Sequence, residues 1–398
     1  MKKILILAAT TAALLFAASS CKKTTTIDIH EYAVKIAEKG IQVCNLGDYR
    51  GVGLAEGLAE LAVTTGREDD MNRVMEIMRK YGRGEVEMSP SRNFYFFDGG
   101  GLGACILANA GVEEVKAALL PALQRQWDEQ PRTTDGFIQA ARNNKNNRIF
   151  IDVIGSTGSS YMYAGQAFGN KEWQDYGAWN ALGLLKLFYE PETGLFHQGR
   201  GTFSNKEYCA LHENDIDTAH WSRGNGWACK GIRCMVSDLH RDHPLYKEIA
   251  DFAKKYYEGV FKYMDENGMF HQEMTDFTSY PEVSGTTYIL MGLAACIKAG
   301  ILDEATYKPY FEKGLKGVFA YIDPDGSIGH VCTGCLTPGD GSKEAYKAKP
   351  YFYNEDHACG PMVQFLASAL SLGYDKITID GVPGSKNEGD RQEKPKKK

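Results

Sequence analysis

Apolar residues recur every three to four positions along most of the chain, which is the spacing of helices with one buried face. Several of these stretches begin or end with residues typical of helix boundaries. Pro244 suits the first turn of a helix, and Asp303 and Glu304 favour its positive end. Gly111 and Gly300 suit the position that follows a helix. Twelve helices are predicted, over residues 28–42, 51–65, 69–81, 99–110, 113–128, 156–168, 171–188, 222–241, 244–265, 284–300, 304–321 and 357–372.

A short turn pattern recurs between these helices. A polar residue, a glycine and one or two apolar residues are followed by His or Gln, with the glycines at positions 136, 194, 268 and 326. A left-handed glycine explains each turn, and the spacing between turns suits two helices and two loops. Strand signals are few and short, over residues 94–97 and 149–153. Six helical hairpins joined by glycine-rich loops predict an all-α fold, an (α/α)6 barrel whose inner helices leave a cleft at one end.

The first 20 residues predict an export signal. Lys2 and Lys3 precede an apolar run, residues 4–18, that is too short for a comfortable membrane span. Small residues before Cys21 resemble a bacterial lipoprotein cleavage site, and an ordinary secretory signal is the alternative. Acyl chains on Cys21 would give stable anchoring, with residues 21–27 as a tether. We therefore expect an exported bacterial lipoprotein, anchored to a membrane through Cys21 at a periplasmic or cell-surface face.

The remaining chain divides into two parts. Residues 28–375 carry the helical pattern and form the predicted catalytic domain. Residues 376–398 are predicted to be a disordered polar tail, because the end of the chain is charged, rich in Lys and without apolar periodicity.

Composition excludes some partners. The 398 residues are 43% hydrophobic and 24% charged, which is ordinary for a globular protein. The formal net charge of −6 becomes −8 when Lys2 and Lys3 leave with the signal, which argues against nucleic acid as a partner. Cys332 and Cys335 form a lone C-x-x-C, which we interpret as loop cysteines or a disulfide, because no further zinc ligands follow at matching spacing. We expect neither a metal nor a cofactor.

The segment HWSRGNGW, residues 220–227, concentrates side chains that suit an acidic sugar. Trp221 and Trp227 offer flat apolar faces, and Arg223 offers a planar fork of donors that matches a carboxylate. The alternative is a helix N-terminus whose tryptophans belong to the core.

Together with four other blocks, this segment resembles glycoside hydrolase family 105, the unsaturated rhamnogalacturonyl hydrolases, and more distantly family 88, the unsaturated glucuronyl hydrolases. The resemblance runs from about residue 28 to 372. It implies that the enzyme removes a 4,5-unsaturated uronic acid from the non-reducing end of lyase-generated oligosaccharides. Water adds across the C4=C5 double bond, and the hemiketal then opens and expels the leaving sugar. The other blocks are RIFID (148–152), TGLFHQG (193–199), PEVSGT (281–286) and NEDHACGP (354–361).

Two acids are predicted to be catalytic. Asp152 matches the general acid/base of the family, and it lies in an apolar run, residues 149–154. A lone carboxyl there loses hydration, which raises its pKa toward the range that a proton donor needs. A helix cap is the alternative for Asp152. Asp98 aligns with a second acid of the family, and an N-cap is its alternative.

Seven residues are predicted to bind the acidic oligosaccharide. Arg223 would hold the uronate carboxylate or a nearby hydroxyl, while the tryptophans would stack on sugar faces. His197 would donate to a hydroxyl or to the attacking water. The others either contact sugar or support the residues that do. The full set is His197, Trp221, Arg223, Asn225, Trp227, Glu282 and His357.

Departures from the family pattern leave the substrate open. Gln139 stands where many members have histidine, and residues 153–156 differ from the usual Leu-Phe-Met. Two other functions also remain open from the sequence: a hydrolase or lyase acting on saturated uronides in the same barrel, and a non-catalytic glycan-binding lipoprotein.

Overall fold

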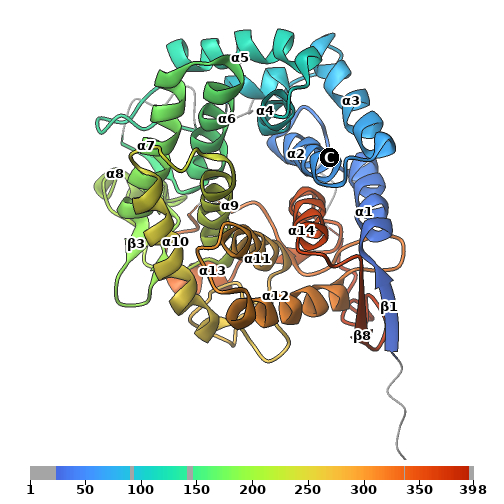
Figure 1. Ribbon diagram of the computed structural model, residues 1–398. Coiled ribbons are helices and arrows are strands. Elements are labelled where there is room, and N and C mark those ends of the chain that lie inside the picture. Colours follow the sequence, from blue (N-terminus) through green and yellow to red (C-terminus); the bar gives the residue numbers. More distant parts are fainter. Residues whose placement is uncertain (1–23, 90–93, 141–146, 336, 394–398) are drawn as a thin grey trace, which may run out of the picture.

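A computed structural model describes residues 24–89, 94–140, 147–335 and 337–393. Its helices form two concentric rings around one core (Figure 1). All twelve predicted helices are present, so the predicted (α/α)6 barrel is confirmed. Two short helices that the periodicity did not predict, α8 (Lys206–Leu211) and α13 (Lys343–Lys347), lie in connecting loops.

The inner ring is buried nearly all round. In α11 every residue from Val283 to Ile297 is buried, as expected for a helix that is apolar on all faces. The inner helices are α2 (Tyr49–Thr65), α4 (Gly101–Asn109), α6 (Ser159–Phe168), α9 (Ser222–Asp238), α11 (Val283–Lys298) and α14 (Cys359–Ser371).

The outer ring buries one stripe per helix. In α10 the buried residues lie three to four positions apart, and the polar residues between them face solvent. The outer helices are α1 (Ile29–Val43), α3 (Glu68–Gly82), α5 (Lys116–Glu129), α7 (Lys171–Phe188), α10 (Tyr246–Val260) and α12 (Glu304–Val318).

Glycines let the inner helices α2 and α14 approach closely. A Cβ atom on Gly57 would lie 2.7 Å from the carbonyl oxygen of Gly360. A Cβ atom on Gly360 would lie 2.5 Å from the carbonyl oxygen of Gly53. Any larger residue at these positions would therefore push the ring open beside the first turns of α2.

Each outer helix returns the chain, so the inner helices all begin at the same end of the barrel (Figure 1). The free N–H groups and the positive dipole ends of six helices gather there. That end is therefore suited to an anionic ligand.

Short antiparallel strand pairs fix the loops. β2 (Ile149–Phe150) pairs with β5 (Gly199–Arg200), and β3 (Tyr189–Glu190) pairs with β4 (Leu195–Phe196). β6 (Val331–Cys332) pairs with β7 (Tyr351–Phe352).

The predicted tether and tail differ from the structure. β1 (Thr24–Asp28) pairs along its whole length with β8 (Lys376–Asp380), and Ile377 and Ile379 are buried. Asn387 is also buried and donates hydrogen bonds to Asp323 and to the carbonyl of Tyr321. The disordered tail is therefore wrong for residues 376–393, because alternating isoleucines bury one face of a strand despite the polar composition.

Other boundaries also need correction. Residues 95–99 form a 3₁₀ helix, not a strand, and Gly100 ends it with a left-handed φ of 96° that favours glycine. The strand predicted over 149–153 ends at Phe150 and leads into a π-helical turn, Ile154–Gly158.

The predicted signal peptide (residues 1–20) and Cys21 lie outside the described residues, as does the end of the tail at 394–398. Within the described ranges, no helix combines the length and the apolar character that a membrane span requires.

Candidate active site

A cavity of about 470 Å³ opens at the end of the barrel where the inner helices begin. It brings together five of the predicted site residues: Asp152, Trp221, Arg223, Trp227 and His357. A second cavity, of about 640 Å³, lies at the opposite end among the last turns of inner helices and contains none of them. The predicted chemistry therefore gathers at the end that helix dipoles make electropositive.

Asp152 follows β2 and precedes the π-helical turn, so its carboxyl reaches the cavity wall. Removal from water raises the pKa of Asp152 to about 6, although hydrogen bonds from Gln198 and from its own backbone favour the charged form. The Oδ1 atom accepts a hydrogen bond from Gln198 Nε2 at 2.8 Å. A carboxyl with this pKa exchanges protons near neutral pH, which a general acid/base must do.

Gln198 was not predicted, although it stands inside the TGLFHQG block. Its backbone is fixed on both sides: Ile151 N–H donates to its carbonyl at 2.9 Å, and Asp217 accepts from its N–H at 2.9 Å. Burial raises the pKa of Asp217 to about 6, and Tyr346 donates to the same carboxyl. This network holds the Gln198 amide against Asp152.

Arg223 is buried at the cavity wall, and its guanidinium holds a loop. Nη1 donates to Ser284 Oγ at 3.0 Å and to the carbonyl of Cys332 at 2.7 Å, and Nη2 donates to the carbonyl of Thr333 at 2.7 Å. These bonds use three of the five donors of a guanidinium. The predicted carboxylate fork is thus largely engaged within the protein, and Arg223 supplies a fixed positive charge.

The two tryptophans have different surroundings. Trp221 is buried, its indole N–H donates to Gln272 at 3.0 Å, and Arg223 covers its ring at 4.5 Å. Trp227 is only partly buried and packs on Tyr288 with ring centroids 4.9 Å apart. Trp227 is therefore the better stacking surface for a sugar.

A buried ion pair lines the cavity and was missed from the sequence. Lys230 Nζ donates to Glu56 Oε2 at 2.6 Å, and both side chains are almost fully buried. Trp227 follows Arg223 by four residues and Lys230 follows Trp227 by three, which places all three on one helix face. That spacing is the signal that could have found Lys230.

His357 precedes α14 and lines the cavity beside Tyr49. Its Nδ1 lies 2.7 Å from Glu355 Oε1, and its Nε2 lies 2.5 Å from the Tyr49 hydroxyl. Since a carboxylate only accepts, Nδ1–H donates to Glu355, and Nε2 of the neutral ring accepts from Tyr49. The predicted His357 is thus in place, and Tyr49 joins it as a residue that the motifs did not predict.

An aromatic wall completes the cavity. Phe94, Phe96 and Phe97 come from the segment that was predicted to be a strand, and Phe150 comes from β2. These apolar faces suit the C–H face of a sugar and exclude water from Asp152.

Four of the nine predicted site residues do not line the cavity in the described part of the chain: Asp98, His197, Asn225 and Glu282. Asp98 lies on the 3₁₀ helix and acts electrostatically on Arg125 of α5. His197 follows β4, where successive extended side chains point to opposite sides, so Gln198 faces Asp152 and His197 faces away. Neither side chain lines the cavity with Asp152, and the catalytic role of Asp98 and the sugar-binding role of His197 stay predictions.

Asn225 and Glu282 support the site from within the protein. Asn225 is fully buried and bonds the backbone N–H and C=O of Phe196, each at 2.9 Å. Glu282 caps α11 by accepting from the N–H groups of Ser284 and Gly285, and it also accepts from the N–H of Cys332. The structure therefore favours the alternative in which Asn225 and Glu282 support the loops around the site and do not contact sugar.

Two clusters of possible metal ligands appear, although the sequence offered none at ligand spacing. One consists of the consecutive residues 355–357 beside the cavity. The other joins Glu190, His197 and His220, which are 7 and 23 positions apart along the chain. Short spacing motifs cannot detect ligands that folding brings together from separate loops.

Comparisons with known proteins agree with this geometry. A segment of 166 residues, 41% of this chain, is 30% identical to an unsaturated 3S-rhamnoglycuronyl hydrolase of Alteromonas sp. (strain LOR) and covers 37% of that protein. A segment of 244 residues, 60% of this chain, is 24% identical to the unsaturated rhamnogalacturonyl hydrolase YesR of Bacillus subtilis (strain 168) and covers 66% of it. The matches thus span from about a third to about two thirds of these relatives' lengths.

Solved structures share the fold. A family 105 glycoside hydrolase of C. acetobutylicum superimposes with a TM-score of 0.71 at 18% identity, over 85% of this chain and 99% of that one. The resemblance drawn from the five sequence blocks is confirmed. The model of Glycosyl Hydrolase Family 88 matches residues 26–372, and the chain belongs to that family.

Proposed function

We propose that the protein removes a 4,5-unsaturated uronic acid from the non-reducing end of acidic oligosaccharides by hydrating the C4=C5 bond. The observation that carries the proposal is Asp152, a carboxyl with a pKa of about 6 at the wall of a cavity with aromatic and basic sides. Family membership and the names of the relatives support the substrate class.

Asp152 performs both proton transfers. Its acid form donates a proton to C4 of the enol ether, which leaves positive charge at C5. The carboxylate that results stabilises this charge and accepts a proton from the water that attacks C5. The product is a hemiketal, and its opening expels the leaving sugar. One carboxyl near both carbons is sufficient for this sequence.

The other carboxyl at the cavity wall is not available for a second role. Glu56 is held by Lys230 at 2.6 Å in a buried ion pair. Ordinary glycoside hydrolysis uses two carboxyl groups on either side of the scissile bond. One free carboxyl among the described lining residues therefore favours hydration of the double bond over attack at the anomeric carbon.

The uronate carboxylate is accommodated by positive charge. Arg223 lies at the wall, and the first turns of the inner helices point their N–H groups toward this end. The ring of the sugar stacks on Trp227, with the phenylalanine wall on the other side. Gly155 and Ser156 belong to the stretch 153–156 that departs from the family pattern, and both line the cavity, where they contribute to the selection of the leaving sugar.

The test is turnover of a polysaccharide-lyase digest, followed as loss of the near-ultraviolet absorbance of the conjugated double bond. We expect loss of absorbance together with release of the leaving sugar, and neither with Asp152→Asn. An unchanged digest that nevertheless binds to the protein would establish the glycan-binding alternative and end the enzymatic proposal.

We further propose that the mature protein is an exported lipoprotein, anchored through acyl chains on Cys21. The proposal is supported by the basic start, the apolar run and the small residues before Cys21. The test is mass spectrometry of the N-terminal peptide from the native host. A peptide that begins at an acylated Cys21 is expected, and a chain that keeps residues 1–20 would contradict it.

A further inference from the structure

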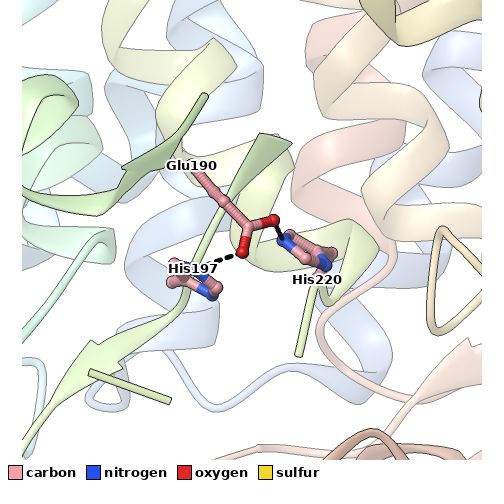
Figure 2. A group of neighbouring side chains, drawn as sticks. All are labelled: Glu190, His197 and His220. Carbon is pink, nitrogen blue, oxygen red and sulfur yellow. Dashed lines mark ion pairs between the residues drawn. The ribbon is translucent and has the colours of Figure 1, made fainter. Parts of the chain in front are cut away.

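A His–Glu–His cluster outside the cavity has no part in the proposed chemistry. Glu190 ends β3, His197 follows β4, and His220 directly precedes Trp221 and α9. Figure 2 shows the two imidazole rings on either side of the Glu190 carboxylate, with a ring nitrogen of each directed at one of its oxygens. Three segments that are separate in the chain thus present one ligand atom each to a common point.

The distances suit a small divalent cation. His220 Nε2 lies 2.8 Å from Glu190 Oε2, and His197 Nε2 lies 3.7 Å from Glu190 Oε1. All three ligand atoms lie within 4.8 Å of one another. Tetrahedral zinc with bonds of about 2.0–2.1 Å separates its ligand atoms by about 3.3 Å. The two carboxylate–imidazole separations therefore differ from the zinc value by about half an ångström.

The second nitrogen of the His197 ring is oriented as in a metal site. His197 Nδ1 lies 3.2 Å from the carbonyl of Ala219, to which Nδ1–H donates. With that proton on Nδ1, a coordinating His197 directs its Nε2 lone pair toward the side of the ring where the Glu190 carboxylate lies. Donation from Nδ1 to a carbonyl is also the usual arrangement behind a metal-bound imidazole.

His220 gives a second, independent indication. Its side chain is 3% exposed, and no described residue hydrogen-bonds to its Nδ1. Without a cation, Nε2 must hold the proton to donate to Glu190, and Nδ1 is left as a buried acceptor with no donor. With a cation on Nε2 the proton moves to Nδ1, which faces the buried carboxylate of Glu273 at 4.0 Å. A cation on Nε2 thus turns Nδ1 from a buried acceptor without a donor among the described residues into a donor that faces a carboxylate.

Neighbouring groups favour the binding form of the site. Thr193 Oγ1 donates to Glu190 Oε2 at 2.7 Å and fixes the carboxylate. The Glu190 side chain is 26% exposed, so an ion has a path from solvent and room for a water in the fourth position.

We propose that Glu190, His197 and His220 bind one Zn²⁺ ion. Two imidazoles and a carboxylate are ligands that zinc prefers. The ion ties the β3–β4 hairpin to the segment that enters α9. That hairpin continues into Gln198, which contacts Asp152, and α9 begins beside Trp221 at the cavity wall. The ion is therefore structural, and it stabilises the two walls of the active site.

The test uses the mature wild-type chain, freed of metal by a chelator and titrated calorimetrically with ZnCl₂. One Zn²⁺ per chain is expected, with a rise in Tm on binding. Loss of a partner behind a zinc ligand already weakens binding by about 10- to 100-fold, so His197→Ala and Glu190→Gln should each weaken it by at least about a hundredfold. The matched control is His212→Ala, which removes a surface histidine paired with Asp215 and should bind zinc like the wild type.

Crystals of the wild type soaked in ZnCl₂ give a second readout, which does not depend on whether any variant folds. Anomalous scattering at the zinc edge should place the ion between the Glu190, His197 and His220 side chains. Absence of binding, unchanged affinity in both variants, or an ion only at residues 355–357 would each overturn the proposal. No substrate enters these measurements, so their outcome is independent of the proposed hydration reaction.

Discussion

Asp152→Asn should make the protein both inactive and more stable at neutral pH. In the folded chain burial raises the pKa of Asp152 from 3.8 to about 6. Removal from water therefore disfavours the charged carboxylate that the proton transfer needs. Asparagine keeps the size and still accepts the hydrogen bond from Gln198, but it neither titrates nor transfers a proton.

The magnitude follows from the difference between the folded and the unfolded pKa. Between pH 3.8 and about 6 the folded state holds a proton that the unfolded chain has lost. The free energy of unfolding of the wild type therefore falls as pH rises through this window. A rise of the pKa from 3.8 to about 6 corresponds to about 3 kcal/mol, and the loss is complete above about pH 7.

The Asp152→Asn variant does not lose stability in this pH window, because asparagine does not titrate. Its free energy of unfolding should equal that of the wild type near pH 4 and exceed it by up to about 3 kcal/mol at pH 8. Turnover should fall at least about a hundredfold, the low end for general acid–base catalysis. The wild-type rate itself should fall as pH rises above about 6, because the acid form of Asp152 disappears.

Two measurements check these numbers. Urea unfolding at pH 4 and pH 8 gives the difference in stability, and absorbance loss with an unsaturated disaccharide gives turnover. Asp215→Asn is the control, since Asp215 is exposed and should change neither quantity. A variant with wild-type turnover would remove Asp152 from the chemistry. A variant that is less stable at pH 8 and no longer binds the disaccharide would instead make Asp152 a structural cap.

Three further predictions concern the surroundings of Asp152. Arg223→Lys should lower the free energy of unfolding by about 1.5–3 kcal/mol and so lower Tm, because lysine loses the hydrogen bonds that the fork donates to two loop carbonyls. KM should rise as well, because this loop lies beside the cavity, and unchanged KM and Tm would refute this role. Gln198→Leu should move the alkaline limb of the pH–rate profile upward by about one unit, because the Asp152 carboxylate loses a donor, and an unmoved limb would show that the bond is unimportant. Dialysis against a chelator should leave turnover unchanged while Tm falls, whereas activity lost and restored by a divalent ion would make the metal catalytic.

The helical framework was predictable because each helix buries an apolar stripe whose spacing is visible in the sequence. The strand pair β1–β8 was missed because its five-residue strands carry only a few alternating isoleucines among polar residues. Ile377 and Ile379 are buried, while the lysines that follow in the chain suggested a tail. The tail was predicted from its polar composition, and the alternation of two isoleucines was too short to indicate a strand.

The site was predictable where one motif supplies both the residue and its direction. Trp227 and Arg223 lie on the first turns of an inner helix, so their contact with the cavity follows from the fold. His197 and Gln198 show the limit, since one position along an extended segment decides which of them faces Asp152. Sequence resemblance identified the block, and only the strand pairing identified the residue.

Lys230 and Glu56 illustrate another limit. They lie 174 positions apart, on α9 and α2, and each alone is an ordinary charged residue of a helix. Only the closure of the inner ring brings them together as a buried pair that occupies the second carboxyl of the cavity. The inference that one carboxyl acts alone therefore depends on the three-dimensional structure.

The central claim is that the double bond itself is the point of attack. Two disaccharides that differ only in the C4=C5 bond of the non-reducing uronic acid test it most directly, with release of the leaving sugar measured for both. The account predicts that the unsaturated disaccharide is cleaved with loss of its ultraviolet absorbance and that the saturated one is left intact. Cleavage of the saturated disaccharide at a comparable rate would contradict hydration as the mechanism.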